Sequence, residues 1–425
     1  MPRTAALELL DSVLHQKRLL DDAIQASKAF QALAERDRAL AQQIVRTVLR
    51  HLGEIDFLIS SFLEKPLGKK GKSAENAIRI GLAQLLFLDI ADHAAIDTAV
   101  ALCTGGQMAP YRKLVNAILR RAQREGRTML ESEDTQRLNT PEWLWDSWVN
   151  AYGEAQTRAI VRQHLDEPPL DITAKNDPTT WMAPLGADLM PTGSLRLPKN
   201  RGSVTTLPGF ADGAWWVQDM AASLPARLLG AVADMDVVDL CAAPGGKTME
   251  LAAAGGRVTA VDRSEKRLSR VRENLERTNL NATLITADAV QWRPQVLADA
   301  VLLDAPCSAT GTARRHPDVL WLKKPEDVAK LANLQGRLLA AAVEMVRPGG
   351  LIVYCTCSLQ PEEGPLQIQA FLDENVSVEL DPIQSSEAGA LSDVITSEGY
   401  LRTLPCHLGS QGGMDGFFAA RLRRR

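Results

Sequence analysis

Two cysteines follow apolar runs that are typical of buried strands. Cys307 lies in Asp-Ala-Pro-Cys-Ser at residues 304–308, and Cys357 lies in Tyr-Cys-Thr-Cys-Ser at residues 354–358. Open α/β sheets bind ligands at the carboxyl ends of their strands, so we expect both thiols at such an edge. A thiolate is an effective nucleophile. The pattern therefore favours covalent group transfer over simple binding.

A third apolar run ends in a glycine-containing turn, Cys-Ala-Ala-Pro-Gly-Gly-Lys-Thr at residues 241–248. The end of this turn resembles a P-loop, but a P-loop requires glycine where this chain has Cys241. The pattern Gly-x-Gly-x-x-Gly is missing here too. Asp262 and Asp288 follow the next two expected strands, where an acid can bind ribose hydroxyls or meet an adenine edge. This succession is typical of an S-adenosylmethionine-dependent methyltransferase. The alternative is that each acid only caps a helix.

The two thiols suggest a particular methyl acceptor. C5 of cytosine is a poor nucleophile, and addition of a thiolate to C6 turns it into an enamine-like carbon that can attack a methyl sulfonium. The reaction needs a donor at N3, and Asp304 is placed for this role. We expect its carboxyl group to lie in an apolar pocket and to stay protonated. This reasoning leaves open which of Cys307 and Cys357 is the nucleophile.

The other cysteines and the histidines are interpreted as structural. Buried cysteines are common in protein cores, so the remaining four are expected to pack there: Cys103, Cys241, Cys355 and Cys406. The six histidines are dispersed and none has metal-ligand spacing, so we predict no metal site. His316 has two open interpretations, substrate contact or a structural loop.

Composition indicates a globular protein with two or three domains, since the chain has 425 residues, 45% of them hydrophobic and 24% charged. We expect no signal peptide and no membrane span, and the lack of a Cys-x-x-C pair favours a reducing, cytoplasmic setting. The net charge is −4, but basic residues gather at residues 112–127 and 421–425. Such local clusters modestly favour a polyanionic partner.

The apolar pattern changes twice along the chain. Residues 1–130 show helical periodicity, as in Leu40, Ile44, Val48 and Leu52, and predict an all-α bundle. Residues 140–214 predict two helices, the first with Thr140 as its cap and Pro141 at its first position, and then a small α+β subdomain. Residues 215–425 alternate between strands and helices, which predicts a mostly parallel Rossmann-like sheet. Expected strands are 236–240, 257–261, 282–286, 300–303 and 351–355, and segments near residues 400 and 416–422 are expected to close the sheet as antiparallel strands.

These motifs resemble the RNA cytosine-5 methyltransferases of the NOL/NOP/Sun family. The resemblance rests on the two cysteine motifs, the 241–248 turn, Gln-Asp-Met-Ala-Ala-Ser at 218–223, and the segments 311–318 and 415–418. The helical N-terminal region, above all Lys-Leu-Val-Asn-Ala-Ile-Leu-Arg-Arg at 113–121, resembles a NusB-like RNA-binding domain. Together they imply a bacterial enzyme that modifies 16S rRNA.

The resemblance also implies roles for single residues. It makes Cys357 the nucleophile, and Cys307 the cysteine that assists release of the methylated product. The resemblance also assigns contacts with S-adenosylmethionine to residues of the turn and to charged residues after it. These are Cys241, Ala242, Ala243, Pro244, Gly245, Gly246, Lys247, Asp262, Arg267, Asp288 and Asp304.

Two other functions stay open at this point. A methyltransferase that acts on an amino group or on a protein would share the fold and the cofactor turn but would need no thiol, and the substrate of the enzyme could also be another RNA. A non-catalytic RNA-binding scaffold would use only the NusB-like helices. We expect a monomer by default.

Overall fold

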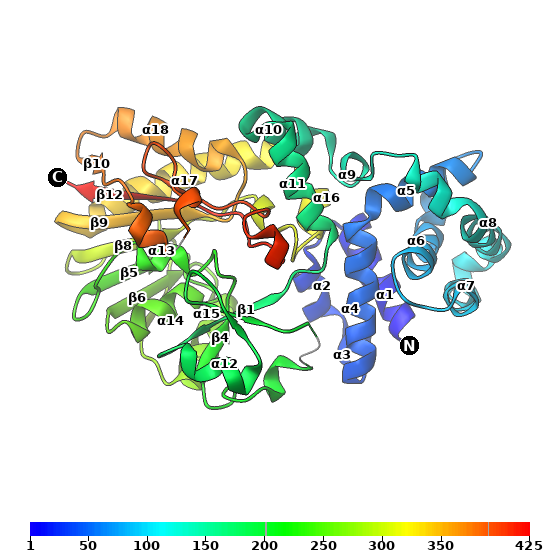
Figure 1. The fold of residues 1–425 in the computed structure, drawn as a ribbon, viewed down its shortest axis with the longest axis horizontal. Coiled ribbons are helices and arrows are strands. Elements are labelled where there is room, and N and C mark those ends of the chain that lie inside the picture. The colour runs from blue at the N-terminus through cyan, green and yellow to red at the C-terminus, as the bar shows by residue number, and fades with distance from the viewer. Residues whose placement is uncertain (200–201, 390) are drawn as a thin grey trace. The chain divides into compact units, whose positions relative to one another are not determined.

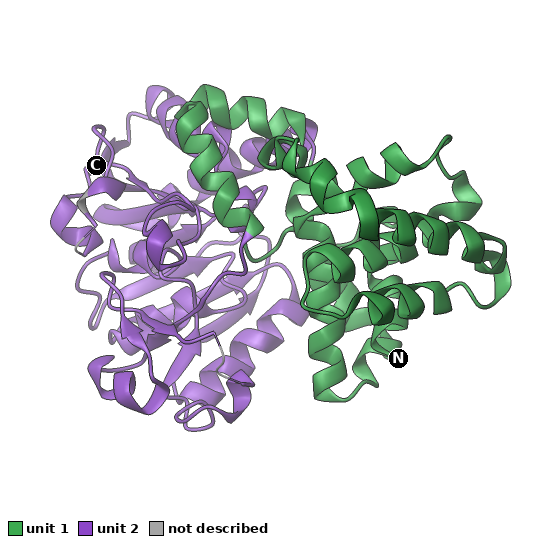
Figure 2. Ribbon diagram, turned by 45° about the vertical axis from the view of Figure 1, so that its right-hand side comes forward, with its two compact units in different colours: residues 1–165, 313–323 green, residues 166–312, 324–425 purple. Residues whose placement is uncertain are grey.

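The computed structural model describes residues 1–199, 202–389 and 391–425. Residues 200–201 belong to the segment expected to form the small subdomain and lie outside the described residues. The chain divides into two compact units, residues 1–165 with 313–323 and residues 166–312 with 324–425 (Figure 2). The three-domain division at 130, 140 and 214 stays a prediction.

The first unit is helical throughout its length, as expected for residues 1–130 (Figure 1). Its α-helices are α1 (Pro2–Leu10), α2 (Leu20–Ala26), α3 (Lys28–Gln31), α4 (Glu35–Arg50), α5 (Leu52–Phe62), α6 (Lys72–Leu86), α7 (Asp92–Ala101), α8 (Arg112–Glu131), α9 (Thr135–Leu138), α10 (Glu142–Tyr152), α11 (Glu154–Leu165) and α16 (Asp318–Leu322).

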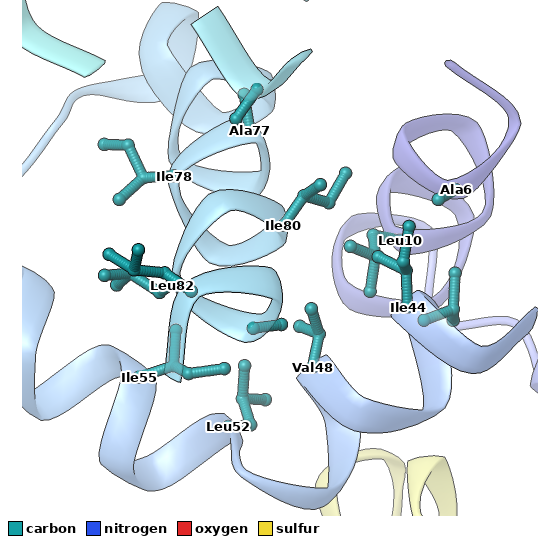
Figure 3. Packing of buried hydrophobic residues seen from close by; sticks show 14 of the residues in the cluster. Ala6, Leu10, Ile44, Val48, Leu52, Ile55, Ala77, Ile78, Ile80 and Leu82 are labelled. Atoms are coloured by element: carbon teal, nitrogen blue, oxygen red, sulfur yellow. The ribbon is translucent and has the colours of Figure 1, made fainter. Parts of the chain in front are cut away.

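The core of this unit forms where apolar stripes of α1, α4, α5 and α6 meet. Figure 3 shows side chains from these helices packed together, among them Leu10, Ile44, Ile55 and Ile80, all of which are fully buried. Each stripe repeats at helical spacing, so one face of each helix can be removed from water. Burial of these stripes holds the helices together.

Two helix boundaries differ from the prediction. The stripe expected to continue through Leu52 spans two helices, because α4 ends at Arg50 and the backbone of His51 (φ −108°, ψ 25°) departs from helical values. The cap expected at Thr140 is also wrong. Pro141 is the N-cap of α10, while the Thr140 hydroxyl donates to the Gln136 carbonyl of the preceding turn.

The segment 313–323 follows the Cys307 loop in the chain but belongs to the helical unit. Asp318 Oδ2 accepts a hydrogen bond from the Leu20 N–H at 2.9 Å, and the Trp321 indole N–H donates to the Leu49 carbonyl at 2.8 Å. His316, for which substrate contact was one interpretation, lies 3.7 Å from Asp21. These contacts tie the segment to α2 and α4.

The second unit contains a small antiparallel sheet followed by a large one. The small sheet has the order β2-β3-β1-β4, with α12 (Thr179–Leu185) between β1 and β2. Its strands are β1 (Leu170–Ala174), β2 (Asp188–Leu189), β3 (Leu195–Leu197) and β4 (Trp215–Val217). Because β4 pairs with β1, the small sheet continues beyond residue 214.

The large sheet has the order β10-β12-β9-β8-β5-β6-β7, with β11 paired to β12. The run from β9 to β7 is parallel, and β12 joins β9 in the antiparallel sense, as the sequence predicts. The strands are β5 (Asp236–Leu240), β6 (Arg257–Asp262), β7 (Thr283–Thr286), β8 (Ala298–Asp304), β9 (Val346–Thr356), β10 (Val378–Leu380), β11 (Leu401–Arg402) and β12 (Phe418–Arg424).

Helices cover both faces of the large sheet (Figure 1). Alternate residues of one strand point to opposite faces, so that Tyr354 packs in one core and Val353 in the other. The covering helices are α13 (Leu224–Arg227), α14 (Gly246–Ala253), α15 (Glu265–Thr278), α17 (Pro325–Met345) and α18 (Pro365–Glu374). The predicted fold class, a helical bundle with a Rossmann-like α/β region and a small α+β element between them, is confirmed. Among the described residues, no helix is both long and apolar enough to cross a membrane.

Candidate active site

The order of strands determines which sequence motifs meet. The chain runs from β5 to β6 and β7 on one side and then returns to β8 on the other side of β5, so the strand order reverses between β5 and β8. Such a switch point opens a crevice at the carboxyl ends of parallel strands. The two cysteine motifs follow β8 and β9, and the glycine turn follows β5. All three motifs therefore reach the same edge of the sheet.

The two predicted reactive cysteines are in contact. Sγ of Cys307 lies 3.4 Å from Sγ of Cys357, and both residues are half-buried. The hydrogen bond with Cys357 and burial raise the pKa of Cys307 well above its usual range, and the negative charge of Glu363 adds to this effect. Cys307 is thus held as a thiol that can donate to the sulfur of Cys357.

The other cysteines differ in how deeply they are buried. Cys355 and Cys103 are fully buried. Burial raises the pKa of the Cys355 thiol well above its usual range, and its Sγ lies 3.5 Å from Asp304 Oδ1. Cys241 is half-buried, and burial raises its pKa to about 12. Neither Cys241 nor Cys355 is therefore suited to act as a thiolate near neutral pH.

Asp304 has a charged partner instead of the apolar pocket expected from the sequence. Its Oδ2 accepts a hydrogen bond from Nζ of Lys247 at 2.8 Å, and the Lys247 side chain is only 9% exposed. Burial opposes the charge on Lys247, but the negative groups around it, Asp304 first, leave its pKa raised. The expectation of an isolated, protonated Asp304 is therefore replaced by an ion pair at the edge of the sheet.

The glycine turn forms a tight connection between β5 and α14. Cys241 (φ 62°) and Gly245 (φ 103°) both adopt left-handed backbone conformations, which are strained for the cysteine and natural for the glycine. Gly245 is the N-cap of α14, so the first N–H groups of this helix face the turn without helical acceptors. Ala242 and Ala243 are buried, Gly246 is half-buried and Pro244 is exposed.

Asp262 is held firmly at the end of β6. Its Oδ1 accepts the Ser264 N–H at 3.0 Å, and its Oδ2 accepts the Ala243 N–H at 3.3 Å. Arg267 lies 3.0 Å from the same Oδ2 and donates to the Ala243 carbonyl at 2.6 Å. The predicted cofactor residues Asp262 and Arg267 are thus brought together and bound to the glycine turn.

Two further carboxyl groups flank the cofactor turn. Asp288 is exposed after β7 and accepts the Val290 N–H at 3.0 Å, so it also caps a turn. Asp239 in β5 was not predicted. It is fully buried, and Thr248 donates to its Oδ2 at 2.6 Å, whereas its Oδ1 has no hydrogen-bond partner among the described residues. Burial raises the pKa of Asp239 to about 7. The acids, the free N–H groups of α14 and this unpaired oxygen fit a nucleotide-type cofactor.

The sequence reasoning also missed a buried carboxylate behind the thiols. Glu363 follows Cys357 by six residues and is completely buried. Its two oxygens accept hydrogen bonds from Ser308, Ser358 and Gln335. The Pro-Glu-Glu sequence around it is typical of an exposed loop, so only the folded structure reveals its position.

Comparisons with known proteins identify the family of the chain. A family model described as 16S rRNA methyltransferase RsmB/F matches residues 226–423, and a model of the NusB family matches residues 1–124. The ribosomal RNA small subunit methyltransferase B of Shigella sonnei is 34% identical over 442 residues, which cover 100% of this chain and 98% of the relative. The protein of the same name from Pasteurella multocida is 36% identical, with 99% and 96% covered.

A solved structure supports the fold over the whole chain. The crystal structure of PH0851 has a TM-score of 0.75 and 22% sequence identity, and the match covers 100% of this chain and 99% of that one. The full-length identity to the curated relatives decides the family. The chain belongs to the family of ribosomal RNA small subunit methyltransferases B, and it is an rRNA methyltransferase with S-adenosylmethionine as its cofactor.

Proposed function

We propose that this enzyme methylates C5 of a cytosine in 16S rRNA through a covalent bond between Cys357 and C6 of the base. The observation that carries the proposal is the 3.4 Å contact between the Cys307 and Cys357 sulfurs at the ends of neighbouring strands. A methyltransferase that acts on an amino group needs no thiol. A pair of half-buried thiols beside the cofactor turn suits a mechanism in which sulfur is first added and then expelled.

Cys357 is the nucleophile in this proposal, and two observations support the choice. Cys307 has a raised pKa and is held as a thiol, so it is the poorer source of a thiolate. The two sulfurs lie 3.4 Å apart, so the thiol of Cys307 can donate to the sulfur of Cys357 when that sulfur is expelled from the base.

The bonds change in three steps. The Cys357 sulfur adds to C6, the C5–C6 double bond opens, and negative charge develops toward N3 of the base. C5 would then accept the methyl group as its bond to the cofactor sulfonium breaks and a neutral thioether leaves, and C5 would lose its proton to a base such as water. The C6–S bond breaks last, the C5–C6 double bond re-forms, and the sulfur leaves as a thiolate. The S–H group of Cys307 stabilises that thiolate by donating to it, which assists release of the product.

Asp304 and Lys247 act on the base. The carboxylate of Asp304 can accept a hydrogen bond from the cytosine amino group, and the buried ammonium of Lys247 stabilises negative charge that develops nearby. Their mutual hydrogen bond of 2.8 Å fixes the orientation of both side chains. This pair therefore takes the role that the sequence assigned to a protonated Asp304 alone.

The residues that would hold S-adenosylmethionine come from three strand ends. The first N–H groups of α14 would meet its charged amino acid end, Asp262 its ribose, and Asp288 its adenine. Arg267 orients Asp262 through their ion pair. When bound, the cofactor supplies an electrophilic methyl group.

The helical unit is proposed to bind the rRNA. Helix α8 exposes a row of basic side chains, Arg112, Lys113, Arg120, Arg121, Arg124 and Arg127. Such a row suits the phosphate backbone, which positions an RNA without reading its sequence. The target cytosine must leave its stack to reach the thiols, so we propose a single-stranded or loop cytosine. We further propose a monomeric, cytoplasmic enzyme.

Trapping of the covalent intermediate tests this proposal. Unmodified 16S rRNA and S-adenosylmethionine are incubated with the Cys307→Ala variant, and the products are separated on a denaturing gel. We expect a band of protein bound to RNA, because the thiolate of Cys357 has no release partner in this variant. The double variant Cys307→Ala/Cys357→Ala is the matched control and must form no such band. Equal amounts of adduct in both variants would exclude Cys357 as the nucleophile.

A further inference from the structure

Glu363 is hydrogen-bonded to both of the loops that carry Cys307 and Cys357. It lies in the turn Pro361–Glu363 after β9, and its side chain is completely buried. Its Oε1 accepts the Ser308 N–H at 2.8 Å, and its Oε2 accepts the hydroxyl groups of both Ser308 and Ser358, the latter at 2.6 Å. Ser308 and Ser358 directly follow Cys307 and Cys357 in the chain. One carboxylate therefore binds both residues that adjoin the reactive thiols.

A carboxylate suits this position because every neighbouring polar group can donate. The amide of Gln335 also donates to Oε1 at 3.1 Å, and the same amide donates to the Pro306 carbonyl at 2.8 Å. The two serine hydroxyl groups lie 3.0 Å apart, so both can point their protons at Oε2. A buried charge is tolerated only where it is fully hydrogen-bonded, and these contacts meet that requirement.

The backbone carbonyl of Glu363 helps to hold its own turn. It accepts hydrogen bonds from the Tyr354 hydroxyl at 2.9 Å and the Thr356 hydroxyl at 3.0 Å. The carboxylate binds Ser358 of the same loop and also Ser308, which lies 55 residues away in the chain. The side chain therefore links the two cysteine loops, which the backbone carbonyl does not.

We propose that Glu363 is a positioning residue that holds the sulfurs of Cys307 and Cys357 in contact by binding both of the serines that follow them. Its role in catalysis rests on the function proposed above, whereas its effect on the distance between the thiols does not. The negative charge of Glu363 also helps to raise the pKa of Cys307. It therefore favours the thiol form of Cys307, which can donate a hydrogen bond to Cys357.

The proximity of the thiols can be measured by disulfide capture. Oxidised glutathione takes two electrons from the pair, so that an S–S bond forms between Cys307 and Cys357 and two glutathione thiols are released. Peptide mass spectrometry quantifies this disulfide and the competing mixed disulfide with glutathione. The full-length enzyme is compared with Glu363→Ala and Glu363→Gln. Glu362→Gln is the matched control, because this neighbouring glutamate is exposed.

We expect Glu363→Ala to form the Cys307–Cys357 disulfide several-fold more slowly and to accumulate mixed disulfide. Its kcat should fall by about 10²-fold with KM for RNA unchanged, which is the penalty typical of reacting groups misplaced by about 1 Å. Glu363→Gln retains two polar atoms that can bind both loops, so it should recover most of the capture rate. Glu362→Gln should match the wild type in both measurements.

Wild-type capture and kcat in a folded Glu363→Ala variant would overturn the proposal. If Glu363→Ala does not fold, the double variant Ser308→Ala/Ser358→Ala is used instead, because it removes only the hydroxyl contacts. It should also form the disulfide more slowly and have a lower kcat. If the wild type transfers no methyl group to RNA while capture still depends on Glu363, the proposed function fails and the positioning role stands.

Discussion

The Sγ atoms of Cys307 and Cys357 lie 3.4 Å apart although fifty residues separate them in the chain. The contact arises because β8 and β9 are parallel neighbours, with Asp304 in register with Cys355, so the two loops leave the sheet at the same level. The contact with Cys357 raises the pKa of Cys307. Variants of this pair should therefore be strongly non-additive.

The first prediction concerns the acidity of Cys307. Cys357 raises the pKa of Cys307 both by hydrogen bonding and by charge, so Cys357→Ala should lower that pKa toward its ordinary value of 9.0. Alkylation of Cys307 by iodoacetamide should then begin at a lower pH than in the wild type, as followed by peptide mass spectrometry. Cys406→Ala is the control and should leave the profile unchanged. An identical profile in Cys357→Ala would show that the pair is not coupled.

The second prediction separates stability from chemistry at the Lys247–Asp304 pair. Lys247→Met leaves the partly buried carboxylate of Asp304 without its cation, which should cost up to about 3 kcal/mol of unfolding free energy, with partial exposure of Asp304 reducing the cost. Adding Asp304→Asn removes the unpaired charge, so the double variant should regain part of this stability in urea unfolding. The double variant should remain unable to transfer methyl groups. Recovery of activity would argue that the pair is only structural.

The third prediction uses a close backbone approach beside the thiols. The Gly311 N–H donates to the Cys357 carbonyl at 3.0 Å, and a Cβ at residue 311 would lie 2.0 Å from the Gly416 carbonyl oxygen. Gly311→Ala should therefore displace the Cys357 loop, cost about 1–3 kcal/mol and reduce methyl transfer. Gly68→Ala meets no atom within 4 Å and serves as the control. Thermal unfolding and kcat that match the wild type would contradict this interpretation of the loop.

The fourth prediction concerns pH and stability. Burial raises the pKa of Glu250 from 4.5 to about 8, so the folded state binds its proton more tightly than the unfolded chain does. The stabilisation is complete below about pH 4.5 and is lost as the pH rises through about 8. Glu250→Gln does not titrate, so its Tm should fall less than that of the wild type across this interval. Parallel Tm curves for the two proteins would show that the carboxyl group does not contribute.

The fifth prediction tests RNA binding by α8. Arg120 and Arg121 are exposed, and Arg121 also lies over the Phe62 ring at 4.7 Å. Replacing both arginines with alanine should weaken RNA binding and reduce the slope of log K against log salt by about one for each phosphate that is no longer neutralised. Lys28→Ala, an exposed basic residue on α3, is the control. An unchanged slope of log K against log salt in the double variant would show that the RNA phosphates do not bind at Arg120 and Arg121.

Much of the fold could be predicted because local signals and tertiary structure agree. The segment Asp236–Leu240 carries Val237, Val238 and Leu240, is bounded by turns, and forms β5 with the expected bounds. The antiparallel strand expected near residues 416–422 forms β12 beside β9. The sequence also placed Cys307 and Cys357 at the carboxyl edge of the sheet, but their contact depends on β8 and β9 being neighbours, which only the structure shows.

The parts that could not be predicted depend on partners that are distant in the chain. Asp304 was expected in an apolar pocket because its own strand is apolar, but Lys247 reaches it from a helix 57 residues earlier. Glu363 lies in a sequence that is typical of an exposed loop, and its burial depends on Ser308 and Gln335. Hydrophobic periodicity carries no information about such polar contacts.

The most direct test is methyl transfer from labelled S-adenosylmethionine to unmodified 16S rRNA, followed by digestion to nucleosides. Wild type, Cys357→Ala and Cys307→Ala are assayed together. We predict 5-methylcytidine with the wild type, none with Cys357→Ala, and label trapped in a protein–RNA adduct with Cys307→Ala. Normal formation of 5-methylcytidine by Cys357→Ala would contradict the central claim that this thiol attacks the base.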